Sequence, residues 1–120
     1  MKISKHTIVL DATDIDTLAD FWAGVLDGTV QRDDDGKWNT VVVDDGPPIA
    51  CQLAPNHVPP NWPEGQQQIH LDLYVEDVAK AHEEVIALGA TMLQEAYKMS
   101  ATEGFIVYAD PAGHPFCLCW

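Results

Sequence analysis

The chain has 120 residues, which suits one domain of ordinary size whose core needs no disulfide or metal to hold it together. Nineteen Asp and Glu against six Lys and Arg give a formal net charge of −13, so nucleic acids and anionic membranes are excluded as partners, whereas a cationic small molecule would be attracted. No apolar run is long enough to cross a bilayer, and residues 1–5 lack the apolar core of a secretion signal. We therefore expect a cytoplasmic protein, and an odd number of cysteines without paired spacing agrees with that compartment.

The first half of the chain predicts a strand, a helix and three further strands. Residues 6–11 alternate, with Ile8 and Leu10 on one face, and Asp14 then begins an amphipathic helix that we expect to end at Gly28. The apolar residues of this helix recur at spacings of three and four and are Leu18, Phe21, Trp22, Val25 and Leu26. Residues 29–31 and 38–43 predict a hairpin around the acidic turn 33–36, and residues 49–53 predict a fourth strand.

The second half begins with a strand over residues 68–77. Its apolar residues occupy every second position, which predicts one buried face formed by Ile69, Leu71, Leu73 and Val75. The opposite face then carries His70, Asp72 and Tyr74, an imidazole, a carboxylate and a phenol in one row, which suits the lining of a cleft. An ordinary polar outer face of a sheet is the alternative.

A helix follows, with Asp77 as its N-cap and Gly89 at its end. Its expected apolar face comprises Val78, Ala81, Val85, Ile86 and Leu88. Residues 90–94, 104–108 and 116–120 predict three strands, and residues 110–113 form a strong turn signal before the last of them.

The two halves therefore repeat the same order of elements, strand, helix and three strands, over about 60 residues each. We predict an α+β fold made of two βαβββ modules, whose mixed sheets curl around a shared cleft. The first module covers residues 1–54 and the second covers residues 68–120. A proline-rich and glutamine-rich linker, residues 55–67, joins them.

Four segments resemble the glyoxalase, bleomycin-resistance and extradiol-dioxygenase superfamily, also called vicinal oxygen chelate, and in particular its glyoxalase-like branch. The most specific is DPAGHPFCL at residues 110–118, and the others are HLDL at 70–73, LADFW at 18–22 and PNWP at 60–63. The resemblance covers essentially the whole chain. It implies a small-molecule cleft, and it implies a homodimer because members of this superfamily often dimerise.

The resemblance also implies where a metal would bind. The four ligands of the superfamily, typically His, Glu, His and Glu, fall on Thr7, Gln52, His70 and Cys117 of this chain. A hydroxyl and a neutral amide are weak ligands for a divalent cation, so we expect no tightly bound catalytic metal. The alternative is a divalent cation, zinc, nickel, manganese or iron, held by His70 together with Asp72 or Cys117.

The residues that we expect to line the ligand-binding cleft come from both halves: Thr7, Asp11, Trp38, Gln52, Trp62, His70, Asp72, Tyr74 and Cys117. His70 is the candidate catalytic residue, and a structural histidine bonded to Asp72 is the alternative. Cys117 is either an inert buried thiol or a nucleophile whose pKa a nearby base would lower. Trp62 is either a flap over the cleft or simply part of the loop packing, and His57 and His82 are expected at the solvent-exposed surface.

Three functions are consistent with these residues. The first is a metal-free protein that binds an aromatic or cationic metabolite or antibiotic and sequesters or modifies it. The second is an enzyme, a lyase, isomerase or dioxygenase that uses a metal or uses His70 as a base. The third is an interaction module whose sheets mainly build a dimer, and it is compatible with either of the others.

Overall fold

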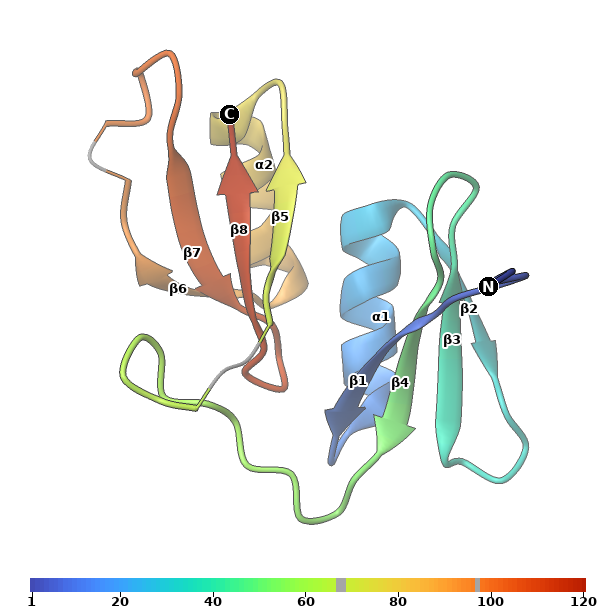
Figure 1. The fold of residues 1–120 in the computed structure, drawn as a ribbon. Coiled ribbons are helices and arrows are strands. Elements are labelled where there is room, and N and C mark those ends of the chain that lie inside the picture. The colour runs from blue at the N-terminus through green and yellow to red at the C-terminus, as the bar shows by residue number, and fades with distance from the viewer. Residues whose placement is uncertain (67–68, 97) are drawn as a thin grey trace. The chain divides into compact units, whose positions relative to one another are not determined.

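The computed structural model describes residues 1–66, 69–96 and 98–120, and its chain forms two compact units, residues 1–58 and 59–120. Each unit has the element order β-α-β-β-β and contains one mixed sheet of four strands (Figure 1). The predicted α+β fold of two βαβββ modules is therefore confirmed. The shared cleft between the modules stays a prediction.

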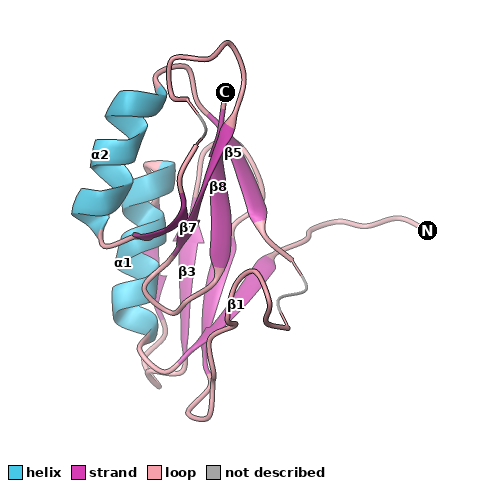
Figure 2. Cartoon of the chain, turned by 90° about the vertical axis from the view of Figure 1, so that its left-hand side faces the viewer, coloured by secondary structure: helices cyan, strands magenta, loops and turns pink. Residues whose placement is uncertain are grey.

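The first unit contains β1 (Ile8–Ala12), α1 (Ile15–Leu26), β2 (Thr29–Arg32), β3 (Trp38–Val42) and β4 (Ile49–Leu53). Its strands lie in the order β1-β4-β3-β2, with β1 parallel to β4 and the other pairs antiparallel. α1 packs on one face of this sheet (Figure 2) and buries the predicted residues Leu18, Phe21 and Trp22 there.

Two polar side chains fix the start of α1. The Asp14 carboxylate accepts hydrogen bonds from the backbone N–H and the hydroxyl of Thr17, which lower the pKa of that carboxyl. The buried Asn39 amide on β3 donates to the Ile15 carbonyl at 3.1 Å and to the Asp16 carboxylate at 2.9 Å. These bonds satisfy polar groups that would otherwise be costly to bury beneath the helix.

The end of α1 differs from the prediction. The residue in the left-handed conformation is Asp27, with φ of 51°, and not Gly28. Gly28 is instead required by a close approach, because a Cβ atom there would lie 2.8 Å from the Val42 carbonyl oxygen and 2.9 Å from Val41 Cγ1. The glycine allows the chain to turn tightly from α1 into the sheet.

The second unit contains β5 (Leu71–Tyr74), α2 (Val78–Leu88), β6 (Thr91–Gln94), β7 (Phe105–Ala109) and β8 (Pro115–Cys119). Its strands lie in the order β5-β8-β7-β6, with β5 parallel to β8 and the other pairs antiparallel. The Asp77 carboxylate accepts from the Lys80 N–H, and Gly89 caps the helix with φ of 111°, as predicted.

The expected extent of the strand and the expected buried residues of this unit are partly wrong. The regular strand is shorter than residues 68–77, so His70 immediately precedes β5, and Gln68 lies outside the described residues. Ile69 is 66% exposed and lies two residues before the start of β5. On α2 only Val78 and Val85 are buried, while Ile86 and Leu88 are exposed, since the helix is in close contact mainly with the single strand β8.

β8 is buried along its whole length. Phe116 and Leu118 face α2 together with Tyr108 of β7, whose hydroxyl lies 2.8 Å from His82 Nδ1. The expectation that His82 is solvent-exposed without a partner is therefore wrong. Cys117 and Cys119 point to the other face of the sheet and pack with Val107.

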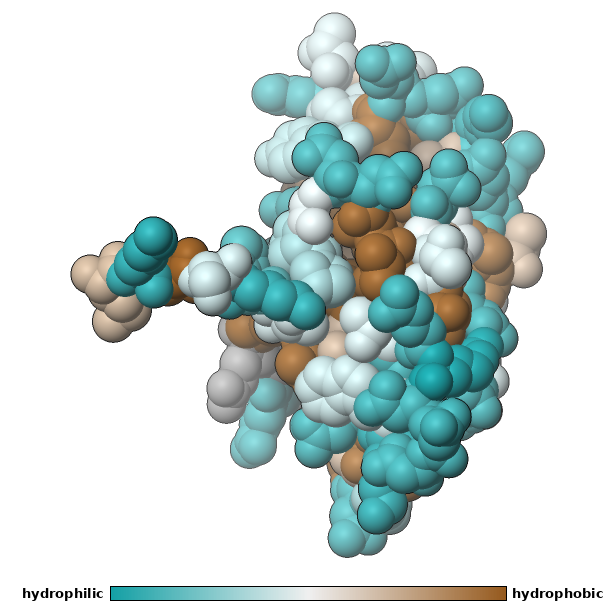
Figure 3. Space-filling model, turned by 90° about the vertical axis from the view of Figure 1, so that its right-hand side faces the viewer, coloured by the Kyte–Doolittle hydropathy of each residue, from teal (hydrophilic) through white to brown (hydrophobic). Residues whose placement is uncertain are grey.

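The surface agrees with the acidic composition. On the face shown in Figure 3 hydrophilic side chains predominate, and the exposed N-terminal residues 1–6 project away from it. Among the described residues, neither helix combines the length and the apolar character that crossing a bilayer requires.

We expect Gly28→Ala to lower the free energy of unfolding by about 1–3 kcal/mol, because the new methyl group overlaps the Val42 carbonyl and Val41. Asp27→Gly should leave this free energy unchanged or raise it by up to about 1 kcal/mol, since glycine adopts the left-handed conformation without strain. Urea denaturation of the two variants tests both values. Equal stability of Gly28→Ala and the unmodified protein would contradict the close approach.

Candidate functional site

A pocket with a volume of about 570 Å³ lies on the face of the second sheet that points away from α2. That volume is within the usual range for small-molecule sites. The lining residues come from β5, β7, β8 and the chain around them: His70, Asp72, Tyr74, Glu103, Gly104, Phe105, Cys117, Cys119 and Trp120. All of them belong to the second unit.

Strand register explains why these side chains meet. Asp72 of β5 pairs with Cys117 of β8, and Tyr74 pairs with Cys119. Phe105 of β7 pairs with Cys119 from the other side. Directly paired residues point to the same face of a sheet, so the two thiols form the floor and β5 and β7 form the two sides.

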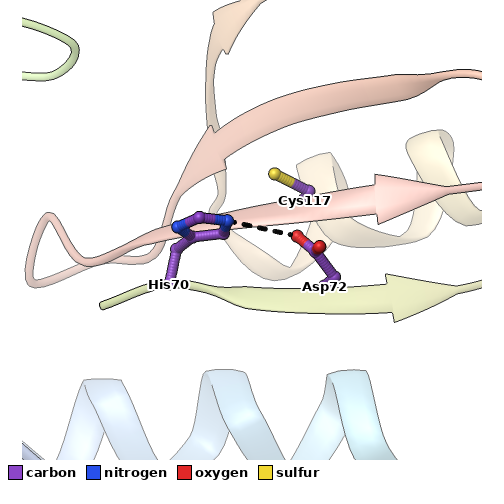
Figure 4. Close-up of side chains that lie close together, drawn as sticks. All are labelled: His70, Asp72 and Cys117. Atoms are coloured by element: carbon purple, nitrogen blue, oxygen red, sulfur yellow. Dashed lines mark ion pairs between the residues drawn. The ribbon is translucent and has the colours of Figure 1, made fainter. Parts of the chain in front are cut away.

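His70, Asp72 and Cys117 form the polar centre of the pocket (Figure 4). His70 Nε2 lies 3.4 Å from Asp72 Oδ1, an ion pair when the imidazole is protonated, and both side chains are about half exposed. The imidazole nitrogen, the carboxylate oxygen and the thiol sulfur all lie within 4.8 Å of one another. The sequence predicted His70 and Asp72 on one face and offered Cys117 as another partner of His70, and the structure brings all three side chains together.

The Cys117 thiol is held in its neutral form. Burial raises its pKa to about 12, and the hydrogen bond to Asp72 and the negative charge of that carboxylate act in the same direction. Burial and Asp72 also raise the pKa of Cys119. A nucleophilic cysteine needs a lowered pKa, so the geometry favours the inert thiol among the two predicted alternatives for Cys117.

Trp120 forms a fixed end of the pocket. Its backbone exchanges two hydrogen bonds with Gly104, of 2.9 and 3.1 Å, and its indole N–H donates to the Ala101 carbonyl at 3.0 Å. A Cβ atom on Gly104 would lie 2.7 Å from the indole ring, so the absence of a side chain there allows the ring to pack closely. Three contacts thus hold the indole in place.

Sequence reasoning did not identify Trp120, Glu103, Phe105 or Cys119 as site residues. The alternation of residues 116–120 placed Cys119 on the same face as Cys117, so that residue could have been found. Glu103 comes directly before the predicted strand 104–108 and Phe105 lies near the start of that strand, and the sequence did not define which other elements they approach.

Trp62, one of the predicted cleft residues, packs against Val107, Cys117 and Cys119 and is partly buried there. The turn that presents it is tight, because a side chain at Gly65 would overlap the backbone of Asn61. Trp62 therefore covers part of the sheet face beside the pocket.

The predicted residues of the first unit lie elsewhere. Trp38 and Gln52 line a separate pocket of about 490 Å³, together with Asp33, Asp35, Lys37 and Leu53. Asp11 is exposed beside Gln52 in the parallel register, and Thr7 is half-buried just before β1. The structure thus brings together His70, Asp72, Tyr74 and Cys117, and it groups Trp38 with Gln52.

The parallel strand pairs of the two units have matching registers, so each possible metal ligand of the second unit has a counterpart in the first. Ile49 pairs with Ile8 as Phe116 pairs with Leu71, so Ala50 is the counterpart of Cys117, and Gln52 is the counterpart of Cys119. A methyl group therefore occupies the first-unit position that matches Cys117. In the second unit, the nitrogen, oxygen and sulfur donors fit a thiophilic cation such as zinc, provided that the thiol loses its proton.

The sequence matches the family model of the glyoxalase-like domain over residues 7–119. The chain therefore belongs to the glyoxalase-like domain family, within the vicinal oxygen chelate superfamily. No protein of curated function matches the sequence.

Solved structures from this superfamily have the same fold. The fosfomycin resistance protein FosX from Listeria monocytogenes superposes with a TM-score of 0.75 at 18% identity, over 99% of this chain and 91% of that one. A glyoxalase/dioxygenase from Nostoc punctiforme gives a TM-score of 0.73 at 17% identity, over 95% and 88% of the two chains. A glyoxalase/bleomycin resistance protein/dioxygenase family enzyme from Burkholderia phytofirmans PsJN gives 0.72 at 16%, over 94% of each.

Because the Cys117 thiol stays protonated, we expect iodoacetamide to label it slowly at pH 8. Asp72→Asn removes the negative charge that helps to raise its pKa, so labelling should become about tenfold faster for each pKa unit recovered. Peptide mass spectrometry measures the rate at each cysteine, and buried Cys51 in the other unit is the internal control. Labelling of Cys117 in the unmodified protein as fast as a free cysteine would contradict the raised pKa.

Proposed function

We propose that the protein binds a small organic cation with aromatic character in the pocket of the second unit and holds it without turnover. The observation that carries this proposal is the composition of the pocket wall. Three aromatic side chains, Tyr74, Phe105 and Trp120, surround a floor of two neutral thiols. Aromatic faces attract both flat rings and positive charge.

The charges of the pocket support a cationic ligand. Asp72 and Glu103 contribute carboxylates, and no described lining residue is Lys or Arg. His70 is the only lining side chain, among the described residues, that can carry a positive charge. The net charge of −13 adds a long-range attraction for cations.

The names of two structural relatives are consistent with a small-molecule ligand. Two of the solved structures described above are named for resistance to bleomycin or fosfomycin, and those names describe the relatives. A shared fold does not transfer a ligand, so the identity of the ligand here rests on the pocket itself. We further propose a homodimer that acts in the cytoplasm, on the basis of the superfamily resemblance and of three buried cysteine thiols.

A metal-dependent lyase, isomerase or dioxygenase is the second candidate, and the cluster of His70, Asp72 and Cys117 favours it. These three side chains would hold the cation, which would polarise a substrate oxygen as a Lewis acid. Against this candidate, the raised pKa of Cys117 means that a metal has to displace a proton from a buried thiol.

We expect protein purified without chelator to contain zinc, nickel, manganese and iron far below one equivalent, because the pKa of about 12 opposes formation of the thiolate at neutral pH. Elemental analysis measures this content. One equivalent of a metal that is lost in His70→Ala and Cys117→Ser, but retained in Cys119→Ser, would overturn the metal-free proposal in favour of the second candidate. Cys119 is the matched control because it shares the floor but lies outside the cluster.

We expect phenyltrimethylammonium to bind more tightly than its neutral isostere tert-butylbenzene. Asp72→Asn and Glu103→Gln should each weaken the binding of the cation about fivefold, since each removes roughly 1 kcal/mol of attraction between largely solvated charges. Isothermal titration calorimetry measures the affinities. Glu83→Gln removes one negative charge from an exposed position on α2, outside the pocket, and should leave the affinity unchanged. Equal affinity for the cation and its neutral isostere would refute the proposal.

A further inference from the structure

We propose that Tyr74 and Phe105 form the two sides of a slot that takes a planar cationic ring, such as an N-alkylated heteroaromatic ring. The edge of the ring would rest on Cys119. This inference rests on the proposed function and names the class of ligand for that site.

The strand register determines where the two aromatic side chains lie. Tyr74, Cys119 and Phe105 are directly paired across three neighbouring strands, so the two aromatic side chains stand on either side of one thiol. Two strand spacings place their backbones about 10 Å apart. A ring stacked between two others needs two stacking distances of roughly 4.5 Å, or about 9 Å in total. The slot therefore has the width of one flat ring.

Both aromatic side chains are exposed to solvent. Tyr74 is 81% exposed and Phe105 is 50% exposed, although the Cys119 side chain between them is buried. Both aromatic rings thus have surface available for a guest, while the floor between them is already dry. A flat ring in the slot would remove apolar surface of both aromatic side chains from water, which a compact ammonium ion cannot do to the same extent.

Two carboxylates of the pocket lie near the two aromatic side chains. Asp72 lies two residues before Tyr74 on the same face of β5, and Glu103 lies next to Gly104, against which Trp120 is fixed. A carboxylate therefore stands on each side of the slot. A positive charge spread over a ring interacts with both, because its charge is not confined to one atom.

The probes 1-methylquinolinium, 1-methylnaphthalene and tetraethylammonium separate shape from charge. The first is flat and charged, the second is flat and neutral, and the third is charged and not flat. We expect 1-methylquinolinium to bind at least tenfold more tightly than either of the others. Quenching of tryptophan fluorescence and titration calorimetry measure the affinities.

Variants test the two walls. Tyr74→Leu and Phe105→Leu should each weaken the binding of 1-methylquinolinium about tenfold and leave that of tetraethylammonium nearly unchanged, because only the flat ring uses both aromatic faces. Tyr74→Phe should retain the affinity. Ile69→Ala changes another exposed apolar residue of this unit outside the pocket and should have no effect. Thermal melting verifies that each variant is folded.

The outcomes distinguish this inference from the function on which it rests. Equal affinity for phenyltrimethylammonium and 1-methylquinolinium, unaffected by the leucine variants, would overturn the slot and leave the binding of an aromatic cation in place. Failure of both cations to bind would overturn the function as well. Tight binding of 1-methylnaphthalene would overturn the requirement for charge.

Discussion

The second unit depends on the burial of β8 on both of its faces. β8 lies between β5 and β7, and every residue from Pro115 to Cys119 is buried. Phe116 and Leu118 fill the space beneath α2, so the remaining side chains have to form a dry floor on the opposite face. Cysteine meets this requirement because its thiol is small and remains neutral when buried. A carboxylate at residue 117, the position at which the superfamily resemblance implies a metal-binding glutamate, would carry a large desolvation penalty unless a bound cation compensated for it. The choice of a thiol thus determines both the shape and the neutrality of the pocket floor.

The two units share a scaffold and differ in the chemistry that they display. Thr7, Val9 and Asp11 in the first unit correspond in register to His70, Asp72 and Tyr74 in the second, and Ala50 corresponds to Cys117. The side chains at the first-unit positions that match the cluster are a hydroxyl, an isopropyl group and a methyl group. The first unit therefore lacks a counterpart of the polar centre at these positions, although its own pocket contains Trp38 and Gln52. The two units have the same element order and the same parallel register, and their individual side chains decide which unit carries the polar cluster.

The alternation and capping signals of the sequence predicted the fold well. Asp14, Asp77 and Gly89 are caps in the structure because short-range hydrogen bonds and a left-handed backbone are local properties. Asp27, and not Gly28, is the left-handed C-cap of α1. Gly28 is needed because the backbone of β3 passes too close for a side chain, and only the packed sheet shows this close approach. Ile69, Ile86 and Leu88 were expected in the core and are exposed. Periodicity shows which residues share a face of a strand or helix, but it does not show how much of that face a neighbouring element covers. Four of the nine residues that line the pocket were among the predicted cleft residues: His70, Asp72 and Tyr74 follow from alternation and Cys117 follows from the superfamily resemblance, whereas Trp120 and Glu103 depend on contacts between distant segments.

Asp72 links the two candidate functions, because its carboxylate contacts both His70 and Cys117. An organic cation near the carboxylate leaves the proton on the Cys117 thiol, and it needs only the negative charge and the aromatic walls. A divalent metal in the same cluster requires that proton to leave, and the carboxylate itself opposes this step because it helps to raise the pKa of the thiol. The affinity for a metal should therefore rise with pH much more steeply than the affinity for an organic cation. The proton on Cys117, rather than the number of donors in the cluster, decides which of the two occupants the pocket favours at neutral pH.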